Sequence, residues 1–121
     1  MTVKSYQDLI VWQKAMELGE NVYALVKLLP VEERYALSDQ MRRAAVSIPS
    51  NIAEGQARIS TKEFIQFLSV ARGSNAELMT QMLLCERLGY MTAEQTREVK
   101  VLINEIGKML TSLILTLKRT M

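Results

Sequence analysis

The sequence contains no histidine, one cysteine (Cys85), two prolines and five glycines among its 121 residues. Histidine is the side chain most often used as a general base and as a metal ligand, so its absence argues against most hydrolytic and metal-dependent enzymes. A single cysteine can form no disulfide within the chain, and in an apolar run it is expected to be a small core residue. The scarcity of proline and glycine leaves long stretches free to form helix.

The short motifs of common catalytic sites are also missing. The sequence has no glycine-rich phosphate loop, no nucleophile elbow and no cysteine cluster. A di-iron site in a helical bundle needs Glu-x-x-His twice, which a chain without histidine cannot supply. Glu54 and Glu77 could converge across a bundle, but each has an arginine or an amide near it in the pattern. We therefore predict a protein that is not an enzyme and that holds no cofactor and no metal.

No uninterrupted apolar run is long enough to suggest a membrane span. The most apolar segment lies near the C-terminus, and Glu105, Lys108 and Thr111 make it too polar to cross a bilayer. No cationic segment followed by an apolar stretch opens the chain, so nothing indicates secretion. We predict a cytoplasmic location and no membrane partner.

Hydrophobic residues make up 49% of the chain. With so few helix breakers, this composition predicts an all-α protein with a single domain, residues 1–121, around one core. The apolar share is high for a monomer of this size, which predicts that other subunits cover part of the apolar surface. The alternative is a loosely specified core rich in methionine, of which the chain has eight.

Apolar residues recur at helical spacing in four segments. The pattern predicts helices at about 5–29, 37–57, 61–89 and 92–118, with Pro30 ending the first. Long amphipathic helices joined by short connections form an antiparallel up-down-up-down four-helix bundle.

Local signals place the ends of these helices. Ser38 is predicted to cap the second helix, and Pro49 is expected to kink that helix or open a turn in it. Capping boxes at Ser60–Glu63 and Thr92–Gln95 predict the starts of the third and fourth helices. Gly89 is a natural residue to follow the end of the third helix.

The first helix carries two apolar stripes where a helix in a small monomer needs one. Either this helix is deeply enclosed or its second face contacts another subunit. The two stripes are Leu9, Trp12, Met16, Gly19, Tyr23 and Val26, and Val11, Ala15, Leu18, Val22, Leu25 and Leu29.

The second helix has a polar stripe beside its apolar one. Its residues are short and mixed in charge, unlike the long Lys and Glu side chains of a solvated face, which predicts a hydrogen-bonded seam against the third helix. Antiparallel packing predicts that Arg43 pairs with Glu77, and that Gly73 permits close approach beside Ser47. A ligand site is the less favoured interpretation of the seam. The predicted network comprises Gln40, Arg43, Ser47, Asn51, Glu54, Ser74 and Glu77.

The net charge is only +2, but it is unevenly distributed. From Glu17 to Asp39 five acids stand against two bases, giving −3, whereas from Arg42 to Arg72 five bases stand against two acids, giving +3. This polarity predicts either an orienting contact between subunits or a basic patch; the alternative is an ordinary mixed surface. The candidates for binding nucleic acid or another partner are Arg42, Arg58, Lys62 and Arg72, joined by Lys118 and Arg119 if the C-terminus lies at the same rim.

A family resemblance follows from particular runs. Gln40-x-Arg42-Arg43-Ala44, followed by Ser47-Ile48-Pro49-x-Asn51-Ile52-Ala53-Glu54-Gly55, closely resembles the signature of the 23S rRNA intervening-sequence protein family. The flanking runs Leu9-x-Val11-Trp12, Pro30-x-x-Glu33 and Gly73-Ser74-x-x-Glu77 match as well, so the resemblance covers nearly the whole chain. It implies an antiparallel four-helix bundle that assembles as a ring-like homopentamer.

The family name records that many of its genes sit inside rRNA intervening sequences, and does not by itself establish an activity. A related accessory protein of diversity-generating retroelements binds nucleic acid and a reverse transcriptase, but it is much more basic than this chain. We expect a non-enzymatic oligomer that binds RNA or a nucleoprotein, with a pentamer repeating a modest basic patch five times. The alternative is a structural or protein-interaction scaffold with no nucleic-acid role.

Overall fold

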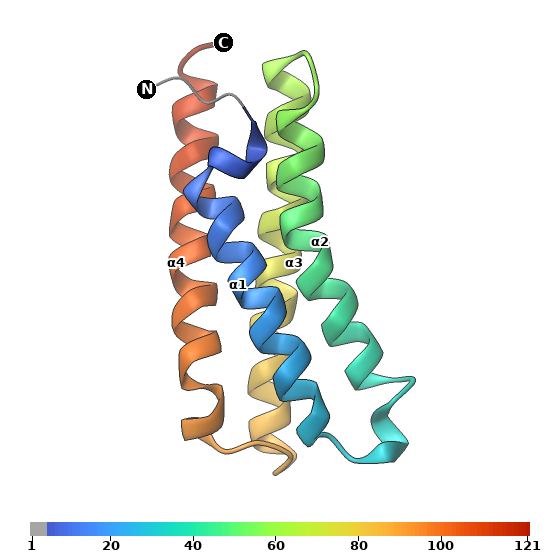
Figure 1. The fold of residues 1–121 in the computed structure, drawn as a ribbon. Helices are drawn as coiled ribbons and strands as arrows, with labels where there is room; N and C mark the ends of the chain where they lie inside the picture. The colour runs from blue at the N-terminus through green and yellow to red at the C-terminus, as the bar shows by residue number, and fades with distance from the viewer. Residues whose placement is uncertain (1–4) are drawn as a thin grey trace.

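The computed structural model describes residues 5–121, and within that range it contains four α-helices, three short 3-10 turns and no strand (Figure 1). The helices run antiparallel in sequence order around the bundle, so that each packs against the next and α1 also packs against α4. The predicted all-α architecture of four helices is confirmed. Their bounds are α1 Ile10–Leu25, α2 Leu37–Gln56, α3 Thr61–Arg87 and α4 Ala93–Lys118.

Each helix contributes one apolar stripe to a continuous core. The stripe of α1 is the one that contains Ala15, Leu18 and Val22, all of which are fully buried. The other stripe of α1 stays at the surface, where Met16 and Tyr23 are 42% and 46% exposed. None of the helices in residues 5–121 combines the length and the hydropathy that a bilayer crossing requires.

The first helix is shorter than its apolar pattern predicts. A separate 3-10 turn at Tyr6–Asp8, closed by the reciprocal Ser5 and Asp8 cap, precedes it, and the extended backbone of Leu9 separates the turn from α1. The Tyr6 ring packs edge-on against Trp12, with ring centroids 5.3 Å apart. At the other end the helix tightens into a 3-10 turn at Val26–Leu28. Side-chain periodicity continues through both turns, which is why it overstates the helix.

The second helix continues through Pro49 without opening a turn. The Asn51 amide donates to the Ser47 carbonyl at 2.8 Å within this stretch. The predicted cap at Ser38 is wrong, because the cap position is Ala36 and Ser38 is buried in the first turn. The backbone N–H of Leu37 donates instead to the Glu33 carboxylate at 3.4 Å.

The ends of α3 and α4 follow their sequence signals. Ser60 accepts a hydrogen bond from the Glu63 backbone at 3.1 Å, and Thr92 and Gln95 form a complete capping box. Gly89 has a φ of +77°, a left-handed conformation that favours glycine because it lacks a Cβ.

Close approach of α2 and α3 depends on Gly55, whereas the sequence predicted Gly73. A Cβ on Gly55 would lie 2.7 Å from the Phe67 Cβ, which is too close for any real pair of such atoms. Gly73 is exposed, and a Cβ there would meet nothing within 4 Å, so the prediction for Gly73 is wrong. The crossing of these two helices is therefore tightest beside the α2–α3 connection.

Candidate nucleic-acid interface

The α2–α3 connection and the C-terminal end of α4 lie at the same end of the bundle (Figure 1). Lys62 stands in the first turn of α3, and Lys118 and Arg119 close α4. Residues 5–17, 54–72 and 105–119 supply this half of the bundle with seven bases against five acids, a net charge of +2. Charge is therefore concentrated in one half of a molecule whose overall charge is only +2.

Five of these bases are both exposed and without a carboxylate partner in residues 5–121. Uncompensated Lys and Arg side chains are the groups that neutralise phosphates, whereas a base already paired with a carboxylate contributes little net charge. We call them the free cations: Lys62, Arg72, Lys108, Lys118 and Arg119.

Arg58, a predicted binding residue, lies at this end, but its guanidinium already contacts two carboxylates and an aromatic ring. Its guanidinium lies 3.1 Å from Glu54 and 3.8 Å from Glu63, and it also stacks 4.9 Å from the centroid of the Phe67 ring. These contacts bind the α2–α3 connection together, so Arg58 has a structural role in this arrangement.

Arg42, another predicted binding residue, lies away from the free cations. It is in the first half of α2 and donates to the Arg34 carbonyl at 3.4 Å. Sixteen residues separate it from Arg58, which corresponds to about 24 Å along a helix axis at 1.5 Å per residue. The four candidates therefore do not form one patch, although Lys62 and Arg72 belong to the basic half.

Arg72 and Lys108 stand on opposite walls of a groove between α3 and α4, which we call the α3–α4 groove. The Asn75 amide donates to the Ile103 carbonyl at 2.9 Å and so fixes the register of the two antiparallel helices. Arg72 lies one turn before Asn75, and Lys108 lies a little more than one turn after Ile103, which brings the two cations to the same level.

The floor of the α3–α4 groove contains an unpartnered acceptor. Asn75 is 4% exposed, and its Oδ1 atom accepts no hydrogen bond within residues 5–121. Gly107 lies beside it, where a Cβ would be 3.3 Å from the Asn75 Nδ2 atom. A buried acceptor without a donor is unfavourable by about 1–3 kcal/mol. A donor that reached this amide oxygen would therefore be bound favourably.

The polar seam between α2 and α3 is smaller than predicted. The Ser47 and Ser74 hydroxyls lie 2.8 Å apart, and the Asn51 amide donates to the Ser47 hydroxyl at 2.9 Å. Glu54 instead pairs with Arg58, and Gln40 is exposed. Three of the seven predicted residues thus meet at the helix crossing.

The predicted pair of Arg43 with Glu77 is wrong. Arg43 is 80% exposed at its side chain and pairs with Asp39, one turn earlier on the same helix, at 3.0 Å. Glu77 accepts from the Gln81 amide on its own helix at 3.4 Å. Neighbours one turn away are already held in place by the helix, so these contacts form without bridging to a second element.

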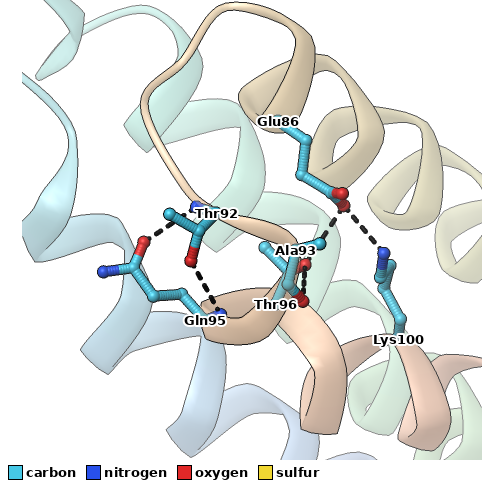
Figure 2. Close-up of polar contacts among 6 residues, drawn as sticks. All are labelled: Glu86, Thr92, Ala93, Gln95, Thr96 and Lys100. Carbon is cyan, nitrogen blue, oxygen red and sulfur yellow. Dashed lines mark hydrogen bonds and ion pairs between the residues drawn. The ribbon is translucent and has the colours of Figure 1, made fainter.

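A polar cluster around the single carboxylate of Glu86, not predicted from the sequence, lies at the connected end of the α3–α4 hairpin (Figure 2). Glu86 accepts from the Lys100 ammonium at 2.9 Å and from the buried Thr96 hydroxyl at 3.1 Å. The hydrogen bond from Lys100 is the main reason that the pKa of Glu86 lies below its ordinary value. Thr96 belongs to the first turn that the Thr92 and Gln95 cap begins, so the cluster ties α4 to the end of α3.

A second groove is apolar and lies between α1 and α2; we call it the α1–α2 groove. Its volume is about 680 Å³, and the surface stripe of α1 forms one wall. Because neighbouring helices follow each other around the bundle, this groove and the α3–α4 groove lie on opposite faces. Its main apolar residues are Trp12, Met16, Tyr23, Val46 and Pro49.

Metal chemistry has no evident location in this structure. Within residues 5–121, no group of three or more Cys, Asp or Glu side chains is arranged to hold a metal ion. Cys85 is buried in the core with its thiol 3.7 Å from the Met41 sulfur. Burial is the main cause that raises the pKa of this thiol to about 11, so it stays protonated and unreactive near neutral pH.

Comparison with known proteins identifies the family. The family model described as "23S rRNA-intervening sequence protein" matches residues 7–112, which is most of the chain. The chain belongs to this family. No curated protein matches the sequence significantly.

A solved structure has a closely similar fold. It is a protein of unknown function from the S23 ribosomal protein family of Bacteroides thetaiotaomicron, 32% identical in sequence with a TM-score of 0.80. The match covers 87% of this chain and 98% of the other. The resemblance of the sequence runs to the 23S rRNA-intervening sequence protein family is confirmed.

Lys108 is the functional candidate in this family member that sequence reasoning missed. Taken alone, it is a charge that interrupts an apolar helix. The sequence could have indicated Lys108 through the α3–α4 hairpin. A turn at Gly89 and Tyr90 places residue 108 opposite residue 72, which is a basic residue already proposed for binding.

Proposed function

We propose that this member of the 23S rRNA-intervening sequence protein family is a non-enzymatic, oligomeric protein that binds RNA or a nucleoprotein through its basic half. The observation that carries the proposal is the set of five free cations in the half of the bundle that contains the α2–α3 connection and the C-terminus of α4. The family is tied by its name to rRNA genes, which makes RNA the first partner to test, although the name records gene position and not an activity.

Electrostatics sets how strong such binding can be. One subunit offers few phosphate contacts, and each contact contributes a salt-dependent increment of affinity through counterion release. A homopentamer, which the family resemblance implies, would present five copies and gain affinity by multivalency. The proposal includes this assembly and a cytoplasmic location, where RNA is accessible.

The α1–α2 groove supports a subunit contact. It is open and apolar, and its residues Met16, Tyr23 and Val46 are each between 42% and 47% exposed. Packing a second copy against this groove would bury that surface. In a ring of five the α1–α2 groove meets a different surface of the next subunit, and the proposal requires that this surface is not the α3–α4 groove.

The proposal assigns the protein no catalytic role. The chain has no histidine, and its lone thiol is buried with a raised pKa. Four carboxylates form ion pairs with Arg or Lys side chains, which suits a structural role better than proton transfer. They are Glu54, Glu63, Glu86 and Glu105.

A titration of the assembled protein with structured RNA and with duplex DNA, at two salt concentrations, tests the proposal. Phosphate binding requires affinity to fall steeply with salt. Lys62→Gln combined with Lys118→Gln should weaken binding and lower the salt slope by about 0.7–0.9 for each phosphate that is no longer neutralised. These side chains are exposed, so the bundle should melt as the unmodified protein does.

The matched control removes one lysine and one arginine from the other end of the bundle. Lys27 and Arg97 are both exposed, and neither forms an ion pair in residues 5–121. Lys27→Gln combined with Arg97→Gln changes the net charge equally and should leave affinity near the unmodified value. An equal decrease in both variants would mean that only total charge matters. Absence of binding at low salt would reject the proposal and leave the scaffold alternative.

A further inference from the structure

We propose that the α3–α4 groove holds the sugar–phosphate backbone of a single RNA strand, with a phosphate between Arg72 and Lys108 and a ribose hydroxyl directed toward Asn75. This inference rests on the RNA-binding function proposed above and assigns it a specific site. It adds Lys108, Asn75 and Gly107 to the residues involved.

The walls of the groove provide the charge. The α3–α4 groove has a volume of about 670 Å³, with Arg72 from α3 and Lys108 from α4 at opposite rims. Both cations are exposed, and neither has a carboxylate partner in residues 5–121. Glu105, the nearest acid to Lys108 along α4, is held by Lys14 at 2.7 Å. Two uncompensated cations on the two walls of one groove favour an anion between them.

The floor contains a hydrogen-bond acceptor that is enclosed in this structure, so a ligand reaches it only when the side chains around it move. The Asn75 Nδ2 atom donates to the Ile103 carbonyl, and this contact fixes the amide orientation so that Oδ1 is the atom without a partner. Ligands that carry a hydroxyl donor next to a phosphate suit this combination. The ribose 2′-hydroxyl of RNA is such a donor, and DNA lacks it.

Gly107 leaves open the space beside the Asn75 Nδ2 atom. Glycine in the middle of a helix is unfavourable by about 1 kcal/mol relative to alanine, and α4 continues eleven residues beyond it. A Cβ at this position would crowd the Asn75 amide at 3.3 Å. The glycine therefore lets a ligand approach the groove floor at the level of the two cations.

The shape of the groove favours one strand over a duplex. The axes of two packed helices lie about 8–10 Å apart, so the trough between them can admit one extended chain, whereas a duplex would rest on its rims. Met79 and the half-exposed Leu115 also line the groove and offer apolar contact to a sugar or base. Single strands are the form in which RNA exposes its sugars and base edges to proteins.

The test is fluorescence anisotropy with a short labelled oligouridylate and the deoxy oligomer of the same length, using the full-length protein. Arg72→Gln combined with Lys108→Gln should weaken oligouridylate binding about tenfold at low salt and reduce the salt slope by about 1.4, the value for two contacts to a single strand. The Lys27→Gln and Arg97→Gln control should retain affinity.

A second pair of variants tests the floor without changing charge. Gly107→Ala should lower affinity for oligouridylate severalfold and narrow its preference over the deoxy oligomer, with no decrease in thermal stability. Gly73→Ala is the matched control, because it makes the same change one residue from Arg72 where a Cβ meets nothing within 4 Å. It should bind as the unmodified protein does.

The outcomes separate the groove from the wider function. If RNA binds, and Lys62→Gln with Lys118→Gln weakens it while the Arg72 and Lys108 variant and Gly107→Ala do not, the groove assignment is overturned and RNA binding stands. If no RNA binds at low salt, both proposals fail. Displacement of the oligomer by uridine monophosphate at comparable concentration would also overturn the assignment, because the groove would then take a free nucleotide.

Discussion

The glycines of this bundle have different structural roles, which the sequence alone does not distinguish. Gly55 is buried against Phe64 and Phe67, whereas Gly73 and Gly19 have no atom within 4 Å of the position of a Cβ. Sequence reasoning chose Gly73 because it stands beside Ser74 in the middle of a helix. The rotation of each helix about its axis decides which glycine is enclosed, and a small shift in rotation changes the answer.

We predict that Gly55→Ala destabilises the protein. Overpacking costs about 1–3 kcal/mol, and the higher helix propensity of alanine offsets only about 1 kcal/mol of it. The Phe67 Cβ is attached to the backbone, so α2 and α3 must separate to relieve the contact at 2.7 Å. Urea denaturation should show a lower midpoint, and Gly73→Ala should show an unchanged or higher one. A stabilised Gly55→Ala variant would contradict the close crossing.

Glu86 gives a prediction for acid stability. Its hydrogen bond from Lys100 lowers its pKa below the ordinary value of 4.5. A carboxyl group with a depressed pKa in the folded state stabilises the fold above its unfolded pKa and loses that contribution as the pH falls through its folded pKa. Glu86→Gln should therefore be less stable at neutral pH but less sensitive to acid below about pH 4.5.

Urea midpoints measured from pH 7 down to acid would check the Glu86 prediction. Glu98→Gln is a suitable control, since Glu98 is exposed on α4 and forms no ion pair in the described range 5–121. If the stability of Glu86→Gln still fell with acid as steeply as that of the unmodified protein, Glu86 would not be the titrating group.

At the scale of helices, local sequence signals predict where a helix begins and ends, but they predict poorly which way its side chains point. The capping groups Ser60, Thr92 and Gly89 are read directly from the sequence, and α3 and α4 begin and end within two residues of the prediction. The predicted Arg43 contact fails because it depends on which way a side chain points from α2. The binding site shares this limit, since Arg42 and Arg58 are basic in sequence but lie apart or are neutralised in space.

The connections between helices are also joined to each other. The Tyr90 hydroxyl, in the α3–α4 connection, donates to the Glu33 carboxylate, in the α1–α2 connection, at 2.9 Å. This hydrogen bond is the main reason that the pKa of Tyr90 is raised from its ordinary value of 10.0. Two loops far apart in sequence are thereby fixed at one end of the bundle.

We predict that Tyr90→Phe lowers stability at neutral pH. A group with a raised pKa in the folded state stabilises the fold fully below its unfolded pKa and loses this as the pH rises through the folded value. The unmodified protein should therefore lose stability above about pH 10, and the variant should lose less. Thermal melts at pH 7 and in alkali test this; parallel curves for both proteins would contradict the contact.

For the whole molecule, the α1–α2 groove is the surface that the proposed assembly would cover. We predict that Val46→Glu dissociates the assembly while leaving each bundle folded, because Val46 is 47% exposed and a carboxylate there must be desolvated on subunit contact. Val101→Glu is the matched control, since Val101 is 51% exposed on α4 and lies outside both grooves.

Light scattering at micromolar concentration gives the mass of each variant. A pentamer is expected for the unmodified protein and for Val101→Glu, and a monomer for Val46→Glu. A monomer for the unmodified protein would refute the assembly altogether. A dimer would retain the apolar contact but contradict the homopentamer that the family resemblance implies.

The rate at which a thiol reagent modifies the buried Cys85 can be used to measure transient opening of the bundle. Its fully enclosed position and raised pKa prevent reaction with a thiol reagent until the helices around it separate. When reclosing outpaces modification, the labelling rate divided by that of an unstructured thiol equals the equilibrium constant for opening. Because mass action stabilises any subunit that a ring holds, labelling of an assembled protein should slow as its concentration rises.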